Sequence, residues 1–216
     1  MRQPHPPRSF WFAHVVRATV GNLLPLVFRM RVVGRENIPG GGVILAGNHV
    51  SYADPCLLWC VSPRPTHFMA KIELWDVDFL GWCLDHFWAF PVRRDAVDRD
   101  ALRTAGSLLR AGEPIGVFPE GTRHSGGMGE GQGGAAFLAI HNDAPVVPVG
   151  IAGTESIMPA GTRFPRLARV VVSFGKPIEP ASYLQPSRKE RVDAMTTDIM
   201  GAIARELEVA RLRRQG

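Results

Sequence analysis

The chain has 216 residues, of which 45% are hydrophobic and 21% charged, and this balance excludes an intrinsically disordered chain, a collagen-like polymer and a protein with many membrane spans. A chain of this length buries about 70% of the surface that its unfolded form exposes, so one domain core needs neither a disulfide nor a structural metal. The net charge is +5, and the first 35 residues account for it because they hold six arginines and no acidic residue.

The basic N-terminal region surrounds an apolar run over residues 10–28. Arginines that flank aromatic and aliphatic side chains favour an anionic membrane surface over nucleic acid as the partner. The run is interrupted by four polar or helix-disturbing residues: His14, Arg17, Asn22 and Pro25. It therefore predicts a helical, membrane-associating segment over residues 1–30 that lies in the interface and does not span the bilayer. The alternative is a helix that packs on the domain's own core. Prolines and arginines fill the first eight residues, which does not fit a secretory signal.

Short β-branched runs bounded by glycine and proline recur along the rest of the chain and predict strands. They lie at residues 31–33, 43–46, 66–69, 90–92, 115–118, 146–151 and 169–174. Helices are expected between them at residues 55–61, 98–109 and 134–141, followed by a long C-terminal helix that opens with a capping box at Ser187. This alternation predicts an α/β fold, with a single domain over residues 31–216. A mostly parallel or mixed central sheet is flanked by helices, and loops at the strand ends carry the chemistry.

His49 and Asp54 are the first candidates for chemistry, because they follow directly on the predicted strand at residues 43–46. An imidazole at a strand end can act as a general base near neutral pH. A regular helix would turn Asp54 about 140° away from His49, so a turn must bring the two side chains together. Pro55 favours a turn because the residue before proline avoids the α region. The alternative role for Asp54 is the N-cap of the helix at Pro55, and one carboxylate can serve both roles.

A second cluster follows the predicted strand at residues 115–118, where Glu120, Gly121, Thr122 and Arg123 form a glycine turn. Glycine lets the backbone approach a ligand closely, and the guanidinium of Arg123 offers a planar fork of donors that matches a phosphate. The alternative is a tight surface turn with an ion pair between Glu120 and Arg123.

Three further patterns carry weaker signals. Lys71 and Arg93 place basic side chains after two other predicted strands, but surface bases are usually solvated. Cys56 and Cys60 share a helix face, yet a zinc site needs further ligands, so we expect a buried apolar role and no metal. The odd number of cysteines, without a C-x-x-C pair, predicts reduced thiols of a cytosolic compartment. Residues 129–134 match G-x-G-x-x-G, but no predicted strand ends just before them, so a dinucleotide site is not expected.

Taken in order, these blocks resemble those of the glycerolipid acyltransferase family, which includes 1-acylglycerol-3-phosphate acyltransferases. Residues 48–54 look like its H-x4-D block, and residues 118–123 look like its F-P-E-G-T-R block. Residues 71–93 and 147–153 resemble the second and fourth blocks, and the resemblance extends over residues 31–180. It implies acyl transfer from a thioester of coenzyme A or acyl carrier protein to the hydroxyl of a lysophospholipid, with lysophosphatidate as the expected acceptor.

The resemblance also assigns roles to residues. His49 would be the catalytic base, and Asp54 would orient it. The substrate-binding residues would be Glu120, Gly121, Thr122, Arg123, Lys71 and Arg93. The resemblance implies acyl-CoA or acyl carrier protein as co-substrate, no further cofactor, and a peripheral or monotopic position on the cytoplasmic face of the cell membrane. Three alternatives stay open. The first is an acyltransferase that acts on glycerol 3-phosphate, on another lysolipid or on a non-phosphorylated acceptor. The second is a thioesterase, and the third is a non-catalytic lipid-binding protein of the same fold.

Overall fold

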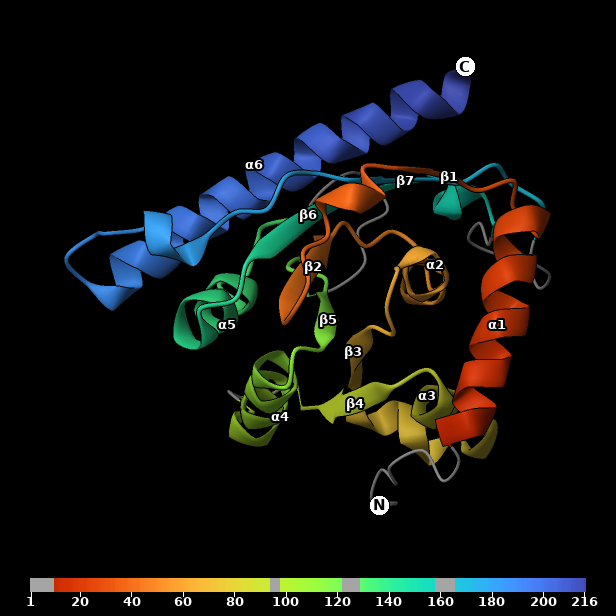
Figure 1. Ribbon diagram of the computed structural model, residues 1–216, viewed down its shortest axis with the longest axis horizontal. Coiled ribbons are helices and arrows are strands. Elements are labelled where there is room, and N and C mark those ends of the chain that lie inside the picture. Colours follow the sequence, from red (N-terminus) through yellow and green to blue (C-terminus); the bar gives the residue numbers. More distant parts are fainter. Residues whose placement is uncertain (1–9, 94–97, 122–128, 158–165) are drawn as a thin grey trace.

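The computed structural model describes residues 10–93, 98–121, 129–157 and 166–216 (Figure 1). Within these residues, seven strands form one sheet in the order β1-β7-β6-β2-β5-β3-β4. Their bounds are Arg31–Val33 (β1), Val43–Gly47 (β2), His67–Lys71 (β3), Ala89–Val92 (β4), Pro114–Val117 (β5), Val146–Ala152 (β6) and Val171–Phe174 (β7). Neighbouring strands run parallel except β6 and β7, which are antiparallel. The predicted α/β fold with a mixed sheet is therefore confirmed, and every predicted strand is present.

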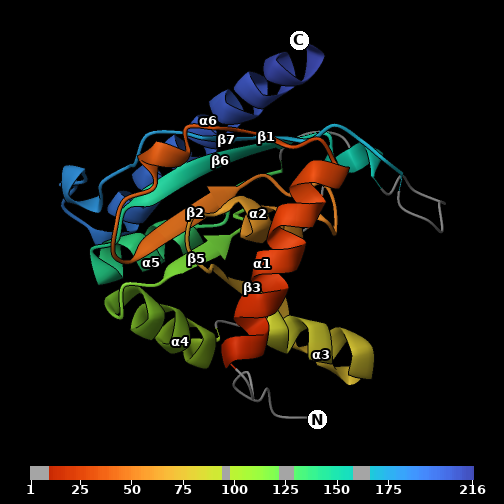
Figure 2. The ribbon, with the colours of Figure 1, turned by 45° about the vertical axis from the view of Figure 1, so that its right-hand side comes forward.

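Helices cover both faces of this sheet. They are α1 (Phe10–Val27), α2 (Asp54–Val61), α3 (Asp78–His86), α4 (Arg99–Arg110), α5 (Gly134–Asn142) and α6 (Arg188–Gln215). Figures 1 and 2 show α4, α5 and α6 on one side of the sheet and α1 and α2 on the other. The capping box that opens α6 is confirmed, because the Ser187 hydroxyl accepts from the N–H of Glu190 and the Glu190 carboxylate accepts from the N–H of Ser187.

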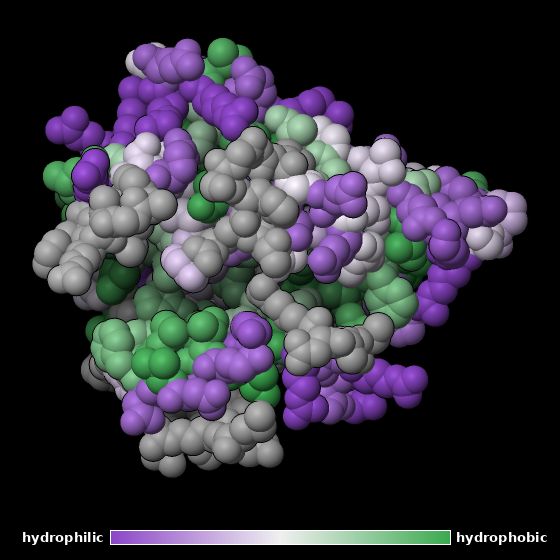
Figure 3. Space-filling model, turned by 180° about the vertical axis from the view of Figure 1, so that it is seen from behind, coloured by the Kyte–Doolittle hydropathy of each residue, from purple (hydrophilic) through white to green (hydrophobic). Residues whose placement is uncertain are grey.

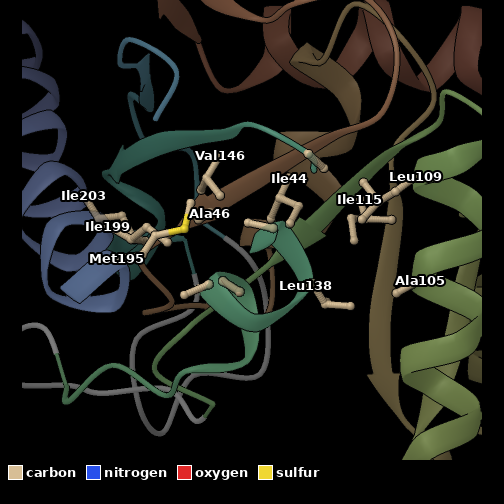
Figure 4. Close-up of a cluster of buried hydrophobic side chains, with 14 of the residues drawn as sticks. Ile44, Ala46, Ala105, Leu109, Ile115, Leu138, Val146, Met195, Ile199 and Ile203 are labelled. Carbon is tan, nitrogen blue, oxygen red and sulfur yellow. The ribbon is translucent and has the colours of Figure 1, made fainter. Parts of the chain in front are cut away.

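Strand β2 lies in the middle of the sheet and is buried along its whole length. Ile44 and Ala46 belong to the core under α4, α5 and α6, whereas Val43 and Leu45 belong to the core under α2. Successive side chains of a strand point to opposite faces, so a strand covered on both sides is hydrophobic throughout. Figure 4 shows the first of these cores, which includes Leu138, Met195, Ile199 and Ile203.

Helix α1 packs on the domain with one of its faces. Val20 and Leu24, together with Phe28 just after the helix, contact the core on the α2 side. The guanidinium of Arg17 donates to the carbonyl oxygen of Ser62 (2.6 Å) at the C-terminal end of α2, where the helix dipole favours a cation. The alternative of a helix packed on the core is thus confirmed for this face. None of the helices in the described part of the chain has the length and apolarity needed to cross a bilayer.

Helix α3 is an element that the sequence patterns do not predict. Its two aromatic side chains do not face a core, since Phe79 is 75% and Trp82 50% exposed. A helix without an apolar stripe toward the interior lacks the periodicity on which prediction of an amphipathic helix depends. In Figures 1 and 2, α3 lies beside the beginning of α1.

Candidate active site

The candidate site lies at the carboxyl ends of β2 and β5, which are parallel neighbours with Ala46 opposite Val117. The segments that follow these strands therefore leave the sheet side by side. The N–H of His49 donates to Oε1 of Glu120 (3.1 Å). The His49 ring stacks on Phe118, with the ring centroids 4.3 Å apart. The fold thus brings together the two clusters that the sequence places 71 residues apart.

His49 and Asp54 form a hydrogen-bonded pair. Nδ1 of His49 lies 2.9 Å from Oδ2 of Asp54, whose side chain is fully buried. The same Oδ2 atom accepts hydrogen bonds from the N–H groups of Val50 (2.8 Å) and Ser51 (2.7 Å). A proton on Nδ1 that is donated to the carboxylate leaves the lone pair on Nε2. This is the tautomer that a general base requires.

The structure corrects the alternative role of Asp54. Helix α2 begins at Asp54 itself, its N-cap is Ala53, and no side chain caps it. Oδ2 of Asp54 accepts from the loop that precedes the helix, and Oδ1 is buried without a hydrogen-bond partner among the described residues. The N-cap interpretation is therefore wrong, because the carboxylate serves His49 and its loop instead.

Glu120 is buried, with 4% of its surface exposed, so its alternative placement on the surface is wrong. Its Oε1 atom accepts from the N–H of His49, and its Oε2 atom accepts from the N–H of Gly129 (2.9 Å). The predicted glycine turn is confirmed, because Gly121 has a φ of +67° and a Cβ there would lie 2.6 Å from the Gln132 side chain. Only glycine adopts this backbone conformation without a steric cost.

The structure does not join the other predicted substrate-binding residues to this pair. Thr122 and Arg123 lie outside the described residues. Lys71 ends β3, and its ammonium group pairs with the carboxylate of Glu73 at 3.1 Å. Arg93 follows β4 and is exposed. β3 and β4 lie next in order beyond β5, with their carboxyl ends at the same edge of the sheet. A substrate contact by either side chain stays a prediction.

Asn48 is a site residue to which no sequence pattern assigns a role. It is 1% exposed, its Nδ2 donates to the carbonyl oxygen of Ile151 (3.0 Å), and its Oδ1 accepts from the N–H of Ile151 (2.7 Å). A buried amide needs hydrogen-bond partners. An asparagine directly after a fully buried strand is the signal that could have found it.

Cys56 and Cys60 lie on α2, which begins at Asp54. Burial raises the pKa of the Cys60 thiol to about 12 and that of the Cys56 thiol to about 11, so both are neutral thiols near pH 7. In the described part of the chain, no group of three histidine, cysteine or carboxylate side chains is arranged to hold a metal ion.

The glycine pattern at residues 129–134 serves packing. A side chain at Gly131 would overlap Met200, and one at Gly133 would lie 2.9 Å from Val192, both on α6. The small residues therefore let this segment lie close against α6.

Comparison with known proteins identifies the family. Residues 29–152, more than half of the chain, match the acyltransferase family. The chain is 32% identical over 188 residues to a 1-acyl-sn-glycerol-3-phosphate acyltransferase of Bacillus subtilis, and the match covers 86% of this chain and 92% of that protein. It is 29% identical over 140 residues to a chloroplast 1-acyl-sn-glycerol-3-phosphate acyltransferase of Arabidopsis thaliana, a match covering 62% of this chain but only 39% of that protein. The crystal structure of the 1-acyl-sn-glycerophosphate acyltransferase of Thermotoga maritima has a similar fold, with a TM-score of 0.72, 25% identity, and coverage of 92% of this chain and 82% of that one. The chain therefore belongs to the acyltransferase family.

Proposed function

We propose that this acyltransferase moves a fatty acyl chain from an acyl thioester to the free hydroxyl of lysophosphatidate, which yields phosphatidate. The observation that carries this proposal is the His49–Asp54 pair, with its Nδ1–Oδ2 distance of 2.9 Å. The names of the relatives from Bacillus subtilis and Thermotoga maritima support lysophosphatidate as the acceptor. Acyl-CoA and acyl carrier protein both present the thioester that the reaction uses.

The reaction needs a base because a neutral hydroxyl is a weak nucleophile. Nε2 of His49 takes the hydroxyl proton while the oxygen attacks the thioester carbon, and Asp54 stabilises the imidazolium that forms. The C–S bond breaks as the carbonyl re-forms, and the imidazolium returns the proton to the leaving thiolate. The products are an ester and a free thiol, so no acyl-enzyme intermediate is required.

The acceptor phosphate is proposed to bind at the segment that follows β5. Arg123 would hold it in two parallel hydrogen bonds, with Gly121 and Thr122 beside it. The positive φ of Gly121 supports a close approach of ligand to backbone there. Lys71 and Arg93, at the ends of β3 and β4, would supply further positive charge to the phosphate or to the donor.

Glu120 is proposed to position this segment and not to touch the substrate. Both of its carboxylate oxygens accept backbone N–H groups, one from His49 and one from Gly129. Gly129 lies beyond the predicted phosphate-binding residues and His49 is the predicted base. One buried carboxylate therefore ties the two parts of the site together.

The acyl chain is proposed to bind on the face toward which β2 and β5 point. In Figure 2 the arrows of β2 and β5 point to the right. This side of the molecule lies toward the back in Figure 1, and Figure 3 shows the molecule from behind. A hollow lined largely by hydrophobic residues lies near its centre, above a hydrophobic patch. Apolar surface of this kind favours a hydrocarbon chain over water.

We further propose that residues 1–30 associate with the cytoplasmic face of the membrane in a peripheral or monotopic manner. α1 keeps one face on the core, while its Leu23 and Leu26 are 57% and 76% exposed. On the neighbouring α3, the exposed rings of Phe79 and Trp82 stack with their centroids 6.4 Å apart. Aliphatic and aromatic side chains of this kind suit the headgroup boundary of a bilayer.

Product analysis tests the proposed function. The purified chain in detergent is incubated with acyl-CoA or acyl carrier protein thioesters and with lysophosphatidate, glycerol 3-phosphate, lysophosphatidylcholine or monoacylglycerol. Mass spectrometry identifies each product and the carbon acylated. We expect phosphatidate, with one free thiol released per ester formed. Turnover with a different acceptor alone would indicate another acyltransferase activity, and thioester hydrolysis without ester would indicate a thioesterase. Lipid binding without turnover would indicate a lipid-binding protein.

A further inference from the structure

The hydrogen bonds between β2 and β6 follow the regular parallel pattern. Ile44 lies opposite Val146, and its N–H donates to the carbonyl oxygen of Pro145 (2.9 Å), the residue before its partner. In such a ladder the same residue accepts from the residue after its partner, and every second residue of the strand repeats both bonds. The last register pair is Gly47 with Val149.

Continued beyond Gly47, this pattern would give Ile151 two hydrogen bonds to main-chain groups of the residues that follow β2. Its N–H would donate to the main-chain oxygen of Asn48, and its carbonyl oxygen would accept from the N–H of Val50. In the structure the side chain of Asn48 makes both bonds, with Oδ1 accepting at 2.7 Å and Nδ2 donating at 3.0 Å. The N–H of Val50 donates instead to Oδ2 of Asp54 (2.8 Å).

We infer that Asn48 is a positioning residue for the His49–Asp54 pair. By taking the place of the Val50 N–H on the sheet, its amide frees that N–H to hold the carboxylate that orients the imidazole. The inference rests on the catalytic role proposed for this pair. An amide suits the position because, like a peptide group, it carries one donor side and one acceptor side. Asn48 is almost fully buried, so it acts through its neighbours and not on the substrate.

Without the amide of Asn48, the carbonyl of Ile151 and the carboxylate of Asp54 compete for one donor, the N–H of Val50. Ile151 is buried, and a buried N–H or carbonyl without a partner is costly. The N–H of Val50 can satisfy the carbonyl of Ile151 only by leaving Asp54. The imidazole then loses its fixed partner, and a displaced catalytic group of this kind lowers the rate by up to about 100-fold. The KM for either substrate should change little.

Asn48→Ala and Asn48→Asp test the inference, together with a matched control. Alanine removes both bonds, whereas aspartate keeps the shape but sets an oxygen against the carbonyl of Ile151. The control is Asn37→Ala, because the Nδ2 atom of Asn37 also donates to a main-chain carbonyl, that of Phe174 (2.8 Å), outside the site. Steady-state kinetics give kcat and KM for each full-length variant.

A second readout reports on the His49 tautomer without any substrate. Correlation NMR of the protein with 15N-labelled histidine distinguishes a proton on Nδ1 from one on Nε2, and His49→Gln assigns the signal. We expect the Nδ1–H form in the wild type and a mixture of forms in both Asn48 variants, with kcat lowered in parallel. Asn37→Ala should lose stability but keep the wild-type spectrum and kcat. An inactive wild type with the expected spectra would contradict the proposed function but leave this geometric inference intact.

Amide hydrogen exchange decides the question if the Asn48 variants do not fold. In Asp54→Ala the N–H of Val50 should exchange faster, while that of Ile151 stays protected, because Ile151 is held by Asn48 and not by the loop. Equal loss of protection at both amides would overturn the inference. So would folded Asn48 variants that keep the wild-type tautomer and kcat, since Asn48 would then be structural only.

Discussion

The imidazole of His49 meets the carboxylate of Asp54 at 2.9 Å because the chain between them is not helical. A continuous helix would place the two side chains about 140° apart. Helix α2 begins only at Asp54. The same carboxylate closes the turn before the helix by accepting hydrogen bonds from its N–H groups, including that of Ser51 (2.7 Å). The carboxylate that orients the proposed base therefore also shapes the loop that presents it.

His49→Ala should lower kcat by about 10² to 10⁴, the usual contribution of a general base, and leave the protein folded. Asp54→Asn should keep residual activity, because the base remains, but lower the melting temperature, because its neutral amide oxygen accepts from the loop N–H groups more weakly than a carboxylate does and its NH2 group takes the buried position of Oδ1, which has no partner among the described residues. Enzyme assays and thermal unfolding of both variants measure these effects.

The control for this pair is His141→Ala, at the end of α5, which should alter neither quantity. Turnover by His49→Ala close to the wild-type rate would contradict the mechanism. An unchanged melting temperature in Asp54→Asn would contradict the second role of the carboxylate.

Glu120→Gln should lower both kcat and the melting temperature. Its two oxygens accept N–H groups from His49 and Gly129, and glutamine must turn an NH2 group toward one of these donors. The buried donor left without a partner costs about 1 to 3 kcal/mol of folding free energy. Glu190→Gln is the control, because the Glu190 carboxylate also accepts a backbone N–H, in the capping box of α6. If the two variants lose stability equally and both keep kcat, Glu120 has no positioning role.

The sequence was sufficient to predict the strands, because glycines and prolines punctuate the chain between them and strands β2, β6 and β7 are buried and mostly aliphatic. Strand β2 illustrates this, since helices cover both of its faces and all of its residues are apolar or glycine. Helix α3 could not be predicted, because its aromatic residues face outward and not toward the core.

The pairing of His49 with Asp54 was predictable from the sequence, but the other hydrogen bonds around the pair were not. The spacing of His49 and Asp54 indicates a pair, yet a carboxylate before proline can accept from the helix after it or from the loop before it. Only the structure shows that this carboxylate accepts hydrogen bonds from the N–H groups of the loop. The role of Asn48 depends on Ile151, 103 residues away, and a local pattern contains no information about such a partner.

Leu23→Glu and Leu26→Glu on α1 should weaken binding to vesicles that contain anionic lipid. Both side chains are largely exposed, so the fold should tolerate the change, unlike deletion of the helix, which removes the core contacts of Leu24. Loss of a buried leucine from the membrane interface corresponds to about tenfold weaker partitioning or more. Vesicle sedimentation measures the change. The exposed Leu184 and Leu212, replaced by glutamate, are the controls. Equal effects at all four sites would exclude a specific role of α1.

Acidification should destabilise the protein through His67. Burial lowers the pKa of this imidazole, although the nearby Glu113 acts in the opposite direction. The unfolded chain binds a proton at the ordinary histidine pKa of about 6.5, while the folded protein does not. The His67 contribution to stability is therefore present above about pH 6.5 and is lost as the pH falls below it. Urea unfolding between about pH 8 and pH 5 should show a smaller loss for His67→Gln than for the wild type. Parallel curves would contradict this assignment.

Arg123→Lys should impair the enzyme in a way that depends on the acceptor. Lysine keeps the positive charge but loses the planar fork that would hold a phosphate in two parallel hydrogen bonds. With lysophosphatidate the KM should rise, and kcat should fall as well if binding of the phosphate aligns the hydroxyl against His49, because remote contacts can be expressed in the transition state. With a monoacylglycerol, wild type and variant should be similarly poor, since the missing phosphate can use neither side chain. The ratio of kcat/KM for the two acceptors, measured in both proteins, isolates this contact. An unchanged ratio would show that Arg123 does not bind the phosphate and would leave it a structural role beside the turn at Gly121.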